Sequence, residues 1–238
     1  MNLDILSALN AERAARRAVI VITDIDSGAQ RIVKADAAAA DPLADLLRER
    51  LRSGKSGMVE TPQGRAFFTV HVPPPRLVAI GAVHISQALA PIAQLLGYDV
   101  TVIDPRTAFA TQERFPDVPV IAEWPDVALP PLGIDRYTAF VALTHDPKID
   151  DPALLHAFAR GCFYIGALGS RKTHGRRIER LKGQGASDSD LARIHAPIGL
   201  AIGAVSPPEI AISIMAEITA ALRQEPEKRQ QRSPERAA

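Results

Sequence analysis

The 238-residue chain has little cysteine, almost no net charge and no long apolar run. Its one cysteine, Cys162, excludes an intramolecular disulfide framework and any site built on several thiolates of this chain, and it favours a reducing compartment. With a net charge of +1, the chain lacks the excess of positive charge that is typical of a general nucleic-acid-binding protein. No stretch approaches the ~18 apolar residues of a membrane-spanning helix, and the first residues do not resemble a secretory signal. We therefore expect a cytoplasmic protein without nucleic-acid or membrane partners.

Several catalytic and metal-binding motifs are also missing. The six histidines show neither His-x-His nor His-Glu-x-x-His spacing, so the sequence does not support an autonomous metal site. It contains no Gly-x-Ser-x-Gly nucleophile turn and no Walker motif. Cys162 lies in an apolar segment, which predicts a buried small side chain rather than a nucleophile.

Three consecutive prolines, Pro73, Pro74 and Pro75, divide the chain about a third of the way along. Such a run fits neither a helix interior nor a sheet ladder, so it predicts a domain boundary. We expect a small domain over residues 1–72, a proline linker over 73–75, a larger domain over 76–223 and a disordered polar tail over 224–238.

The segment before the prolines mixes helix and strand signals. Apolar residues at helical spacing predict a helix over 2–17, and a second helix follows the start signal Asp41-Pro42. Strands are predicted over 18–23, 31–34, 58–60 and 66–72, the last two joined in a hairpin at Pro62-Gln63-Gly64. This pattern predicts a small α+β domain with a structural or interfacial role.

After the prolines, short apolar strands alternate with helices. Strands are predicted over 77–80, 99–103, 118–122, 138–143 and 162–165, and helices over 85–96, 152–160, 172–182 and 188–195. A final helix starts at Ser206-Pro207-Pro208-Glu209, which combines a capping serine, an early proline and a glutamate three residues after the cap. The alternation predicts an α/β fold with a Rossmann-like parallel sheet and helices on both faces.

The first strand, turn and helix of this domain resemble a dinucleotide-binding unit. Gly81 and Asp104 are 23 residues apart, close to the spacing between a phosphate-binding turn and a ribose-binding acid. However, Val83 and Ser86 replace the second and third glycines of the Gly-x-Gly-x-x-Gly pattern, which favours an altered or unused phosphate turn over NAD(P) binding. His84, in the same turn, either donates to a ligand or satisfies a local backbone group.

Thr144, His145 and Asp146 follow the predicted strand 138–143. Residues just beyond the carboxyl end of a parallel strand face the ligand crevice of an open α/β sheet. Adjacent side chains on an extended chain point apart, however, and Asp146-Pro147 is also a helix-start signal. A ligand site and a helix-start turn are both compatible with these residues.

The segment from Gly166 to His174 is the most informative. It follows a predicted strand, contains two glycines and a capping serine, and opens a helix whose first turns are basic. Backbone N–H groups, a helix dipole and cations at one place predict an anion site suited to a phosphate or pyrophosphate, and a solvated basic helix face is the alternative. The candidate residues of this segment are Gly166, Gly169, Ser170, Arg171, Lys172 and His174.

Six segments, in order, resemble the Rossmann domain of the XdhC/CoxI family, accessory proteins of xanthine dehydrogenase and related molybdenum hydroxylases. They cover about residues 76–222. The segments are Gly81–Leu89, Val102–Arg106, Phe109–Pro116, Leu143–Asp146, Tyr164–His174 and Ile194–Leu200.

The resemblance implies a chaperone that binds the molybdenum cofactor, molybdopterin, and does not itself turn over a substrate. It implies two partners, a cysteine desulfurase that sulfurates the cofactor and the apo-hydroxylase that receives it; a homodimer is a further possibility. We expect Arg106, Arg171 and Lys172 to meet phosphate and Asp104 to accept from ligand hydroxyls or amines.

Two competing hypotheses stay open. The first is an NAD(P)-dependent oxidoreductase that uses Asp104 for ribose and His145 as an acid. The second is a scaffold that binds only the hydroxylase or the desulfurase.

Overall fold

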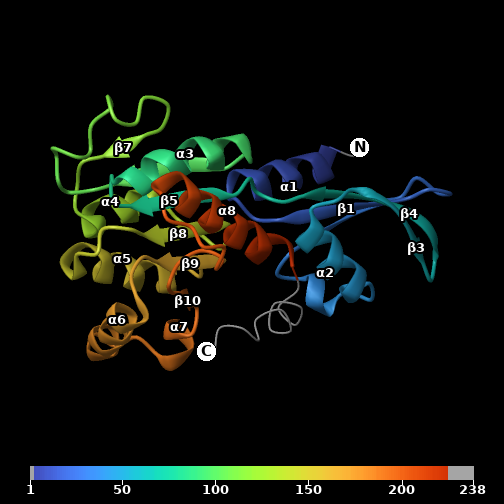
Figure 1. Ribbon diagram of the computed structural model, residues 1–238. Coiled ribbons are helices and arrows are strands. Elements are labelled where there is room, and N and C mark those ends of the chain that lie inside the picture. The colour runs from blue at the N-terminus through green and yellow to red at the C-terminus, as the bar shows by residue number, and fades with distance from the viewer. Residues whose placement is uncertain (1–2, 225–238) are drawn as a thin grey trace. The chain divides into compact units, whose positions relative to one another are not determined.

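The computed structural model describes residues 3–224 of the chain. The chain divides into two compact units, Met1–Pro73 and Pro74–Ala238, and the boundary in the sequence falls within the proline run. Figure 1 labels elements of both units. None of the described helices is long and apolar enough to cross a membrane. The predicted tail over 224–238 lies, apart from Gln224, outside the described residues.

The first unit is built on a four-stranded antiparallel sheet of order β2-β1-β4-β3. Its elements are α1 (Leu3–Ala14), β1 (Val19–Asp24), β2 (Gln30–Lys34), the 3-10 turn Ala38–Ala40, α2 (Ala44–Ser53), β3 (Gly57–Thr61) and β4 (Gly64–His71). Alternate residues of β1 pack with Phe68 and the α2 side chain Leu47 in one core. The predicted mixture of helices with a small antiparallel sheet is therefore confirmed, including the β3–β4 hairpin.

The second unit is built on a six-stranded parallel sheet of order β10-β9-β8-β5-β6-β7. Its strands are β5 (Arg76–Ile80), β6 (Asp99–Ile103), β7 (Val120–Ile121), β8 (Thr138–Ala142), β9 (Tyr164–Ala167) and β10 (Ile194–His195). Numbered from β5, this is the Rossmann order 3-2-1-4-5-6. The predicted Rossmann-like α/β fold is confirmed.

Helices cover both faces of this sheet (Figure 1). They are α3 (His84–Leu95), α4 (Pro125–Leu132), α5 (Pro147–Ala159), α6 (Arg171–Gly183), α7 (Asp188–Leu191) and α8 (Pro207–Arg223). Leu77 and Ala79 of β5 pack into the core beneath α3 and α8, whereas Val78 and Ile80 pack into the core beneath α4 and α5. Because both faces are buried, these strands are continuously apolar rather than alternating.

Two helices predicted from the sequence need correction, and a third helix was not predicted. The helix predicted over 188–195 ends at Leu191, and Ile194–His195 instead form the edge strand β10, which is too short to show a strand pattern. Helix α4 was not expected because three of its eight residues are proline. Helix α5 starts at Pro147 rather than Pro152, because Asp146 caps it by accepting from the Lys148 N–H at 2.9 Å.

Candidate functional site

The carboxyl ends of the parallel strands lie along one edge of the second sheet. β5 and β8 are neighbours there, and the chain leaves β5 toward β6 on one side and β8 toward β9 on the other. Ligands of open α/β sheets bind at such a switch point. The topology therefore brings the segments after β5, β6, β8 and β9, which the sequence singled out separately, to four adjacent positions on this edge.

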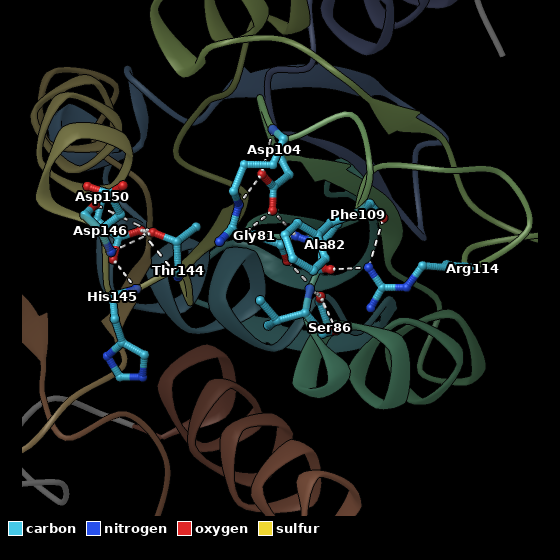
Figure 2. Close-up of polar contacts among 12 residues, drawn as sticks. Gly81, Ala82, Ser86, Asp104, Phe109, Arg114, Thr144, His145, Asp146 and Asp150 are labelled. Carbon is cyan, nitrogen blue, oxygen red and sulfur yellow. Dashed lines mark hydrogen bonds and ion pairs between the residues drawn. The ribbon is translucent and has the colours of Figure 1, made fainter.

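Gly81 directly follows β5 and has a φ of +111°, a backbone conformation that favours glycine. A Cβ atom there would lie 2.9 Å from Thr144 Cγ2 and 3.3 Å from the Thr144 N atom (Figure 2). Glycine is therefore required at position 81 because the backbone there lies very close to the loop after β8. His84 follows in the same turn, as the exposed first residue of α3.

Asp104, which follows β6, is completely buried and holds the turn after β5 (Figure 2). Its Oδ2 accepts from the Ala82 N–H at 2.8 Å and from Arg106 Nη2 at 2.7 Å, and its Oδ1 accepts from the N–H and the Nε of Arg106, both at 2.9 Å. Burial raises the pKa of this carboxyl, but the hydrogen bonds from Arg106 and Ala82 outweigh burial and lower it. The expected role of Asp104 as a ligand acceptor is corrected, because its oxygens are buried and already bonded to the protein.

Ser86 occupies the third glycine position of the dinucleotide pattern and has a defined role. Its Oγ accepts from the Val83 N–H at 2.8 Å and lies 2.6 Å from the Gly81 carbonyl, to which it donates. The amide groups of Ala82 and Val83 are therefore turned toward protein acceptors. A loop whose amides are used in this way has fewer donors left for a pyrophosphate, which disfavours the usual NAD(P) binding mode.

Two arginines, Arg106 and Arg114, and the Phe109 ring lie beside the turn after β5. Arg114 donates from Nη1 to the Ala82 carbonyl at 2.8 Å and from Nη2 to Gln87 Oε1 at 2.9 Å. The Arg106 guanidinium, already paired with Asp104, lies 4.7 Å from the centre of the Phe109 ring. The sequence did not identify Ser86 and Arg114 as residues that support the turn after β5. Both residues lie in the segments that resemble the XdhC/CoxI family, and this was the one indication in the sequence that they contribute to the site.

The loop after β8 is organised by Asp150, a buried residue of α5 that the sequence did not reveal. Asp150 accepts from the Thr144 hydroxyl at 2.7 Å and from the His145 N–H at 3.1 Å. Burial raises the pKa of Asp150, while the Thr144 hydroxyl and the charge of Arg177 act in the opposite direction. These bonds hold His145 at a φ of +63°.

Asp146 and His145 have separate environments. The Asp146 carboxylate caps α5, whereas the His145 side chain is exposed and its ring points away from the Asp146 and Asp150 carboxylates (Figure 2). The helix-start interpretation of Asp146 is confirmed. An acid–base pair between these neighbours is not formed.

The segment after β9 leads into the N-terminus of the 13-residue helix α6. Ser170 caps it by accepting from the Thr173 N–H at 3.2 Å, and Gly169, at a φ of +133°, approaches Thr173 so closely that a Cβ would lie 3.1 Å from its Cγ2. Arg171 and Lys172 are exposed in the first turn, which contains no acidic residue. This arrangement brings backbone donors and cations together, as an anion site requires.

Gly166 has a different role, since it lies within β9 and packs against the protein. A Cβ there would lie 2.5 Å from Ile198 Cδ1 and 2.8 Å from Tyr164 Cε1. Its lack of a side chain is therefore explained by core packing.

Two further side chains of α6, Arg177 and His174, have buried nitrogen atoms without a hydrogen-bond partner. Arg177 is 2% exposed and donates from Nη2 to the Leu168 carbonyl at 2.8 Å, but its Nε and Nη1 have no hydrogen-bond partner, nor does the buried Nδ1 of His174. Burial lowers the pKa of both groups, and the charge of Arg177 lowers that of His174 further. Buried donors such as those of Arg177 call for an acceptor, and the negative charges of Asp150 and Asp151 already act on this guanidinium.

Cys162 is buried just before β9, and burial raises its pKa to about 12. The prediction of a buried side chain is confirmed. Among residues 3–224, no group of three or more His, Cys, Asp or Glu side chains is placed to hold a metal ion.

Comparisons with known proteins agree with this architecture. The family model of the XdhC Rossmann domain matches residues 77–218, well over half of the chain. Three curated proteins are similar: the uncharacterised protein YqeB of Escherichia coli K12 (38% identity over 154 residues), a probable xanthine dehydrogenase subunit of Bacillus subtilis 168 (35% over 147) and the molybdenum cofactor insertion chaperone PaoD of E. coli K12 (32% over 143).

These matches cover 64%, 61% and 60% of this chain and 28%, 42% and 39% of the three relatives, in the same order. The chain thus matches less than half of the length of each relative. A crystal structure of a xanthine dehydrogenase from Bacillus halodurans has a TM-score of 0.64 and 23% identity, covering 97% of this chain and 66% of that one. At this identity the likeness shows a shared fold.

Proposed function

Because the chain belongs to the family of XdhC Rossmann domains, we propose that it is an accessory protein that binds the molybdenum cofactor and supports its insertion into a molybdenum hydroxylase of the xanthine dehydrogenase type. The name of PaoD, a molybdenum cofactor insertion chaperone, and that of the B. subtilis relative support this proposal. The proposal places the protein in the cytoplasm, where it would contact the apo-hydroxylase and a cysteine desulfurase.

The observation that carries the proposal is the N-terminus of α6. Molybdopterin bears a phosphate, and the first turn of α6 combines backbone N–H groups that lack helical partners with the capping Ser170 and the exposed cations Arg171 and Lys172. The unsatisfied donors of Arg177 lie in the same helix. These residues fit a phosphate-bearing cofactor, and they would hold its anionic end.

The other candidate residues divide into supporting and ligand-facing groups. Gly81, Asp104, Asp146 and Gly166 support the loops through the contacts described above. Thr144, His145 and His84 follow neighbouring strands and, with Arg106 and Gly169, would line the cofactor beyond its phosphate.

The cofactor would bring its own dithiolene sulfur ligands for molybdenum. This chain supplies no comparable ligand, because its one cysteine is buried with a pKa raised to about 12. The sulfur added during sulfuration would therefore come from the desulfurase, and this protein would hold and present the cofactor.

Equilibrium titration of the purified full chain with molybdenum cofactor, NAD(H) and NADP(H) tests the proposal. We expect cofactor binding that weakens roughly tenfold or more in the double variant Arg171→Ala plus Lys172→Ala, since each lost charged hydrogen bond contributes about 1.5–3 kcal/mol. The control is Arg160→Ala plus Lys182→Ala, which removes the same charge from the C-terminal ends of α5 and α6, at the opposite edge of the sheet.

Tight nicotinamide binding without cofactor binding would overturn the proposal in favour of an oxidoreductase. Unchanged cofactor binding by the α6 double variant, together with lost association with the hydroxylase or desulfurase, would instead favour a scaffold. A monomer–dimer measurement by sedimentation in the same buffer tests the homodimer.

A further inference from the structure

A polar array at the carboxyl end of β10 joins His195 and Glu217 to Tyr164. His195 Nδ1 lies 3.0 Å from Oε1 of Glu217, a residue of α8 whose side chain is 5% exposed. Oε2 of the same carboxyl accepts from the Tyr164 hydroxyl at 2.7 Å and from the Gly199 N–H at 2.8 Å. The Tyr164 and His195 rings stack with centroids 4.6 Å apart. Three segments of the chain thus fix one imidazole.

The hydrogen-bond pattern determines which nitrogen of His195 carries the proton. Oε2 of Glu217 is already an acceptor of two hydrogen bonds, so only Oε1 faces the imidazole. An imidazole is a stronger base than a carboxylate, so a proton between the two resides on Nδ1. In the neutral ring Nε2 then carries a lone pair and acts as an acceptor.

His195 lies beside the candidate site. It pairs in register with Gly166 of β9, and the chain runs from Gly166 directly into the loop that opens α6. Its side chain is 27% exposed, and no hydrogen bond joins Nε2 to any residue within 3–224. An oriented and partly exposed acceptor therefore lies on the strand next to β9, the strand that leads into the α6 N-terminus.

We propose that His195 Nε2, in the neutral Nδ1–H tautomer, accepts a hydrogen bond from an N–H group of the pterin ring of the bound cofactor, and that Glu217 is the positioning residue that selects this tautomer. This inference rests on the proposed function. Phosphate oxygens are acceptors and pair with the N–H groups of α6, whereas ring and exocyclic N–H groups of a pterin need an acceptor. The two parts of the ligand would thus be recognised by groups of opposite hydrogen-bonding character.

The isosteric change Glu217→Gln tests the positioning role. Because the Oε2 position must accept from Tyr164 and Gly199, the amide oxygen takes that place and the amide N–H₂ faces His195 Nδ1. Nδ1 then becomes the acceptor and the proton moves to Nε2. Long-range ¹H–¹⁵N NMR of the full chain should show the Nδ1–H tautomer of His195 in wild type and the Nε2–H tautomer in the variant. An Nε2–H tautomer in wild type would overturn the inference.

Cofactor titration tests the binding role. His195→Asn retains an N–H at the Nδ1 position for Glu217 but removes Nε2, so we expect a near-wild-type Tm and a roughly tenfold weaker affinity for molybdenum cofactor. The affinity for inorganic pyrophosphate, which has no N–H group, should not change. His156→Asn, the same change near the C-terminus of α5, is the matched control.

The outcomes separate the two proposals. Retained cofactor affinity in His195→Asn would overturn this inference and leave the proposed function standing. Absence of cofactor binding by the wild-type chain would overturn the proposed function and, with it, this inference.

Discussion

Asp104→Asn tests whether the buried carboxylate organises the turn after β5. Asparagine keeps one acceptor oxygen and presents an amide N–H₂ to donors, so about two of the four hydrogen bonds at Asp104 are lost. Each bond to a charged group contributes about 1.5–3 kcal/mol. The Arg106 side chain is 37% exposed, so water partly replaces its share. We expect a loss of about 3 kcal/mol in the free energy of unfolding.

This loss corresponds to a decrease in Tm of about 6–12 °C for a unit of this size. Fluorescence of Trp124, the one tryptophan of the chain, reports the unfolding of the same unit. The control is Asp99→Asn at the other end of β6, because the Asp99 side chain is 64% exposed and its ion pair with Arg76 spans 3.4 Å. Equal Tm values for the two variants would refute the reasoning.

The pH dependence supplies a second check on the same pair of proteins. Folding lowers the pKa of Asp104, so its stabilisation is present above the unfolded pKa of about 3.9 and is lost as the pH falls through the folded value. The stability difference between wild type and Asp104→Asn should stay constant from about pH 8 to 5 and narrow below about pH 4. A difference that widened with acid would contradict the assignment.

Three further predictions follow from packing and burial. Gly166→Ala should lower the free energy of unfolding by about 1–3 kcal/mol in urea titrations, because its methyl group would lie 2.5 Å from Ile198 Cδ1. Gly175→Ala should raise it by about 0.5–1 kcal/mol, since this position is inside α6 and the added Cβ would meet no atom within 4 Å beyond its chain neighbours and the nearby backbone of its own helix; a loss of stability would contradict this reasoning. Cys162, with its pKa raised to about 12, should resist iodoacetamide at pH 8 in the native protein and react fully in guanidinium, as mass spectrometry can measure.

The sequence predicts the central fold well because buried parallel strands and capped helices leave strong local patterns. β6 has the predicted bounds, and α8 begins at its expected cap, where Glu209 accepts from the Ser206 N–H at 2.9 Å. The local sequence does not predict the two-residue strand β10 or the proline-rich helix α4. Packing against neighbouring elements, rather than local conformational preference, determines the structure of these two segments.

The candidate site likewise has some features that the sequence predicts and others that it does not. The topology accounts for the convergence of loops at one sheet edge, which the order of strands and helices already implied. The hydrogen bonds of Asp104 and Asp150 to the backbone are not visible in the sequence, since an acid after a strand predicts a ligand contact and a buried support equally well. Glu217 is likewise hidden, because it lies on the buried side of an apolar helix, 22 residues from the histidine that it orients.

The most direct test of the central claim is an equilibrium titration of the full chain with molybdenum cofactor, compared between wild type, Arg171→Ala plus Lys172→Ala, and the control Arg160→Ala plus Lys182→Ala. The account predicts that wild type and the control bind the cofactor equally and that the α6 variant binds it at least roughly tenfold more weakly. No cofactor binding by wild type, or equal binding by all three proteins, would contradict it.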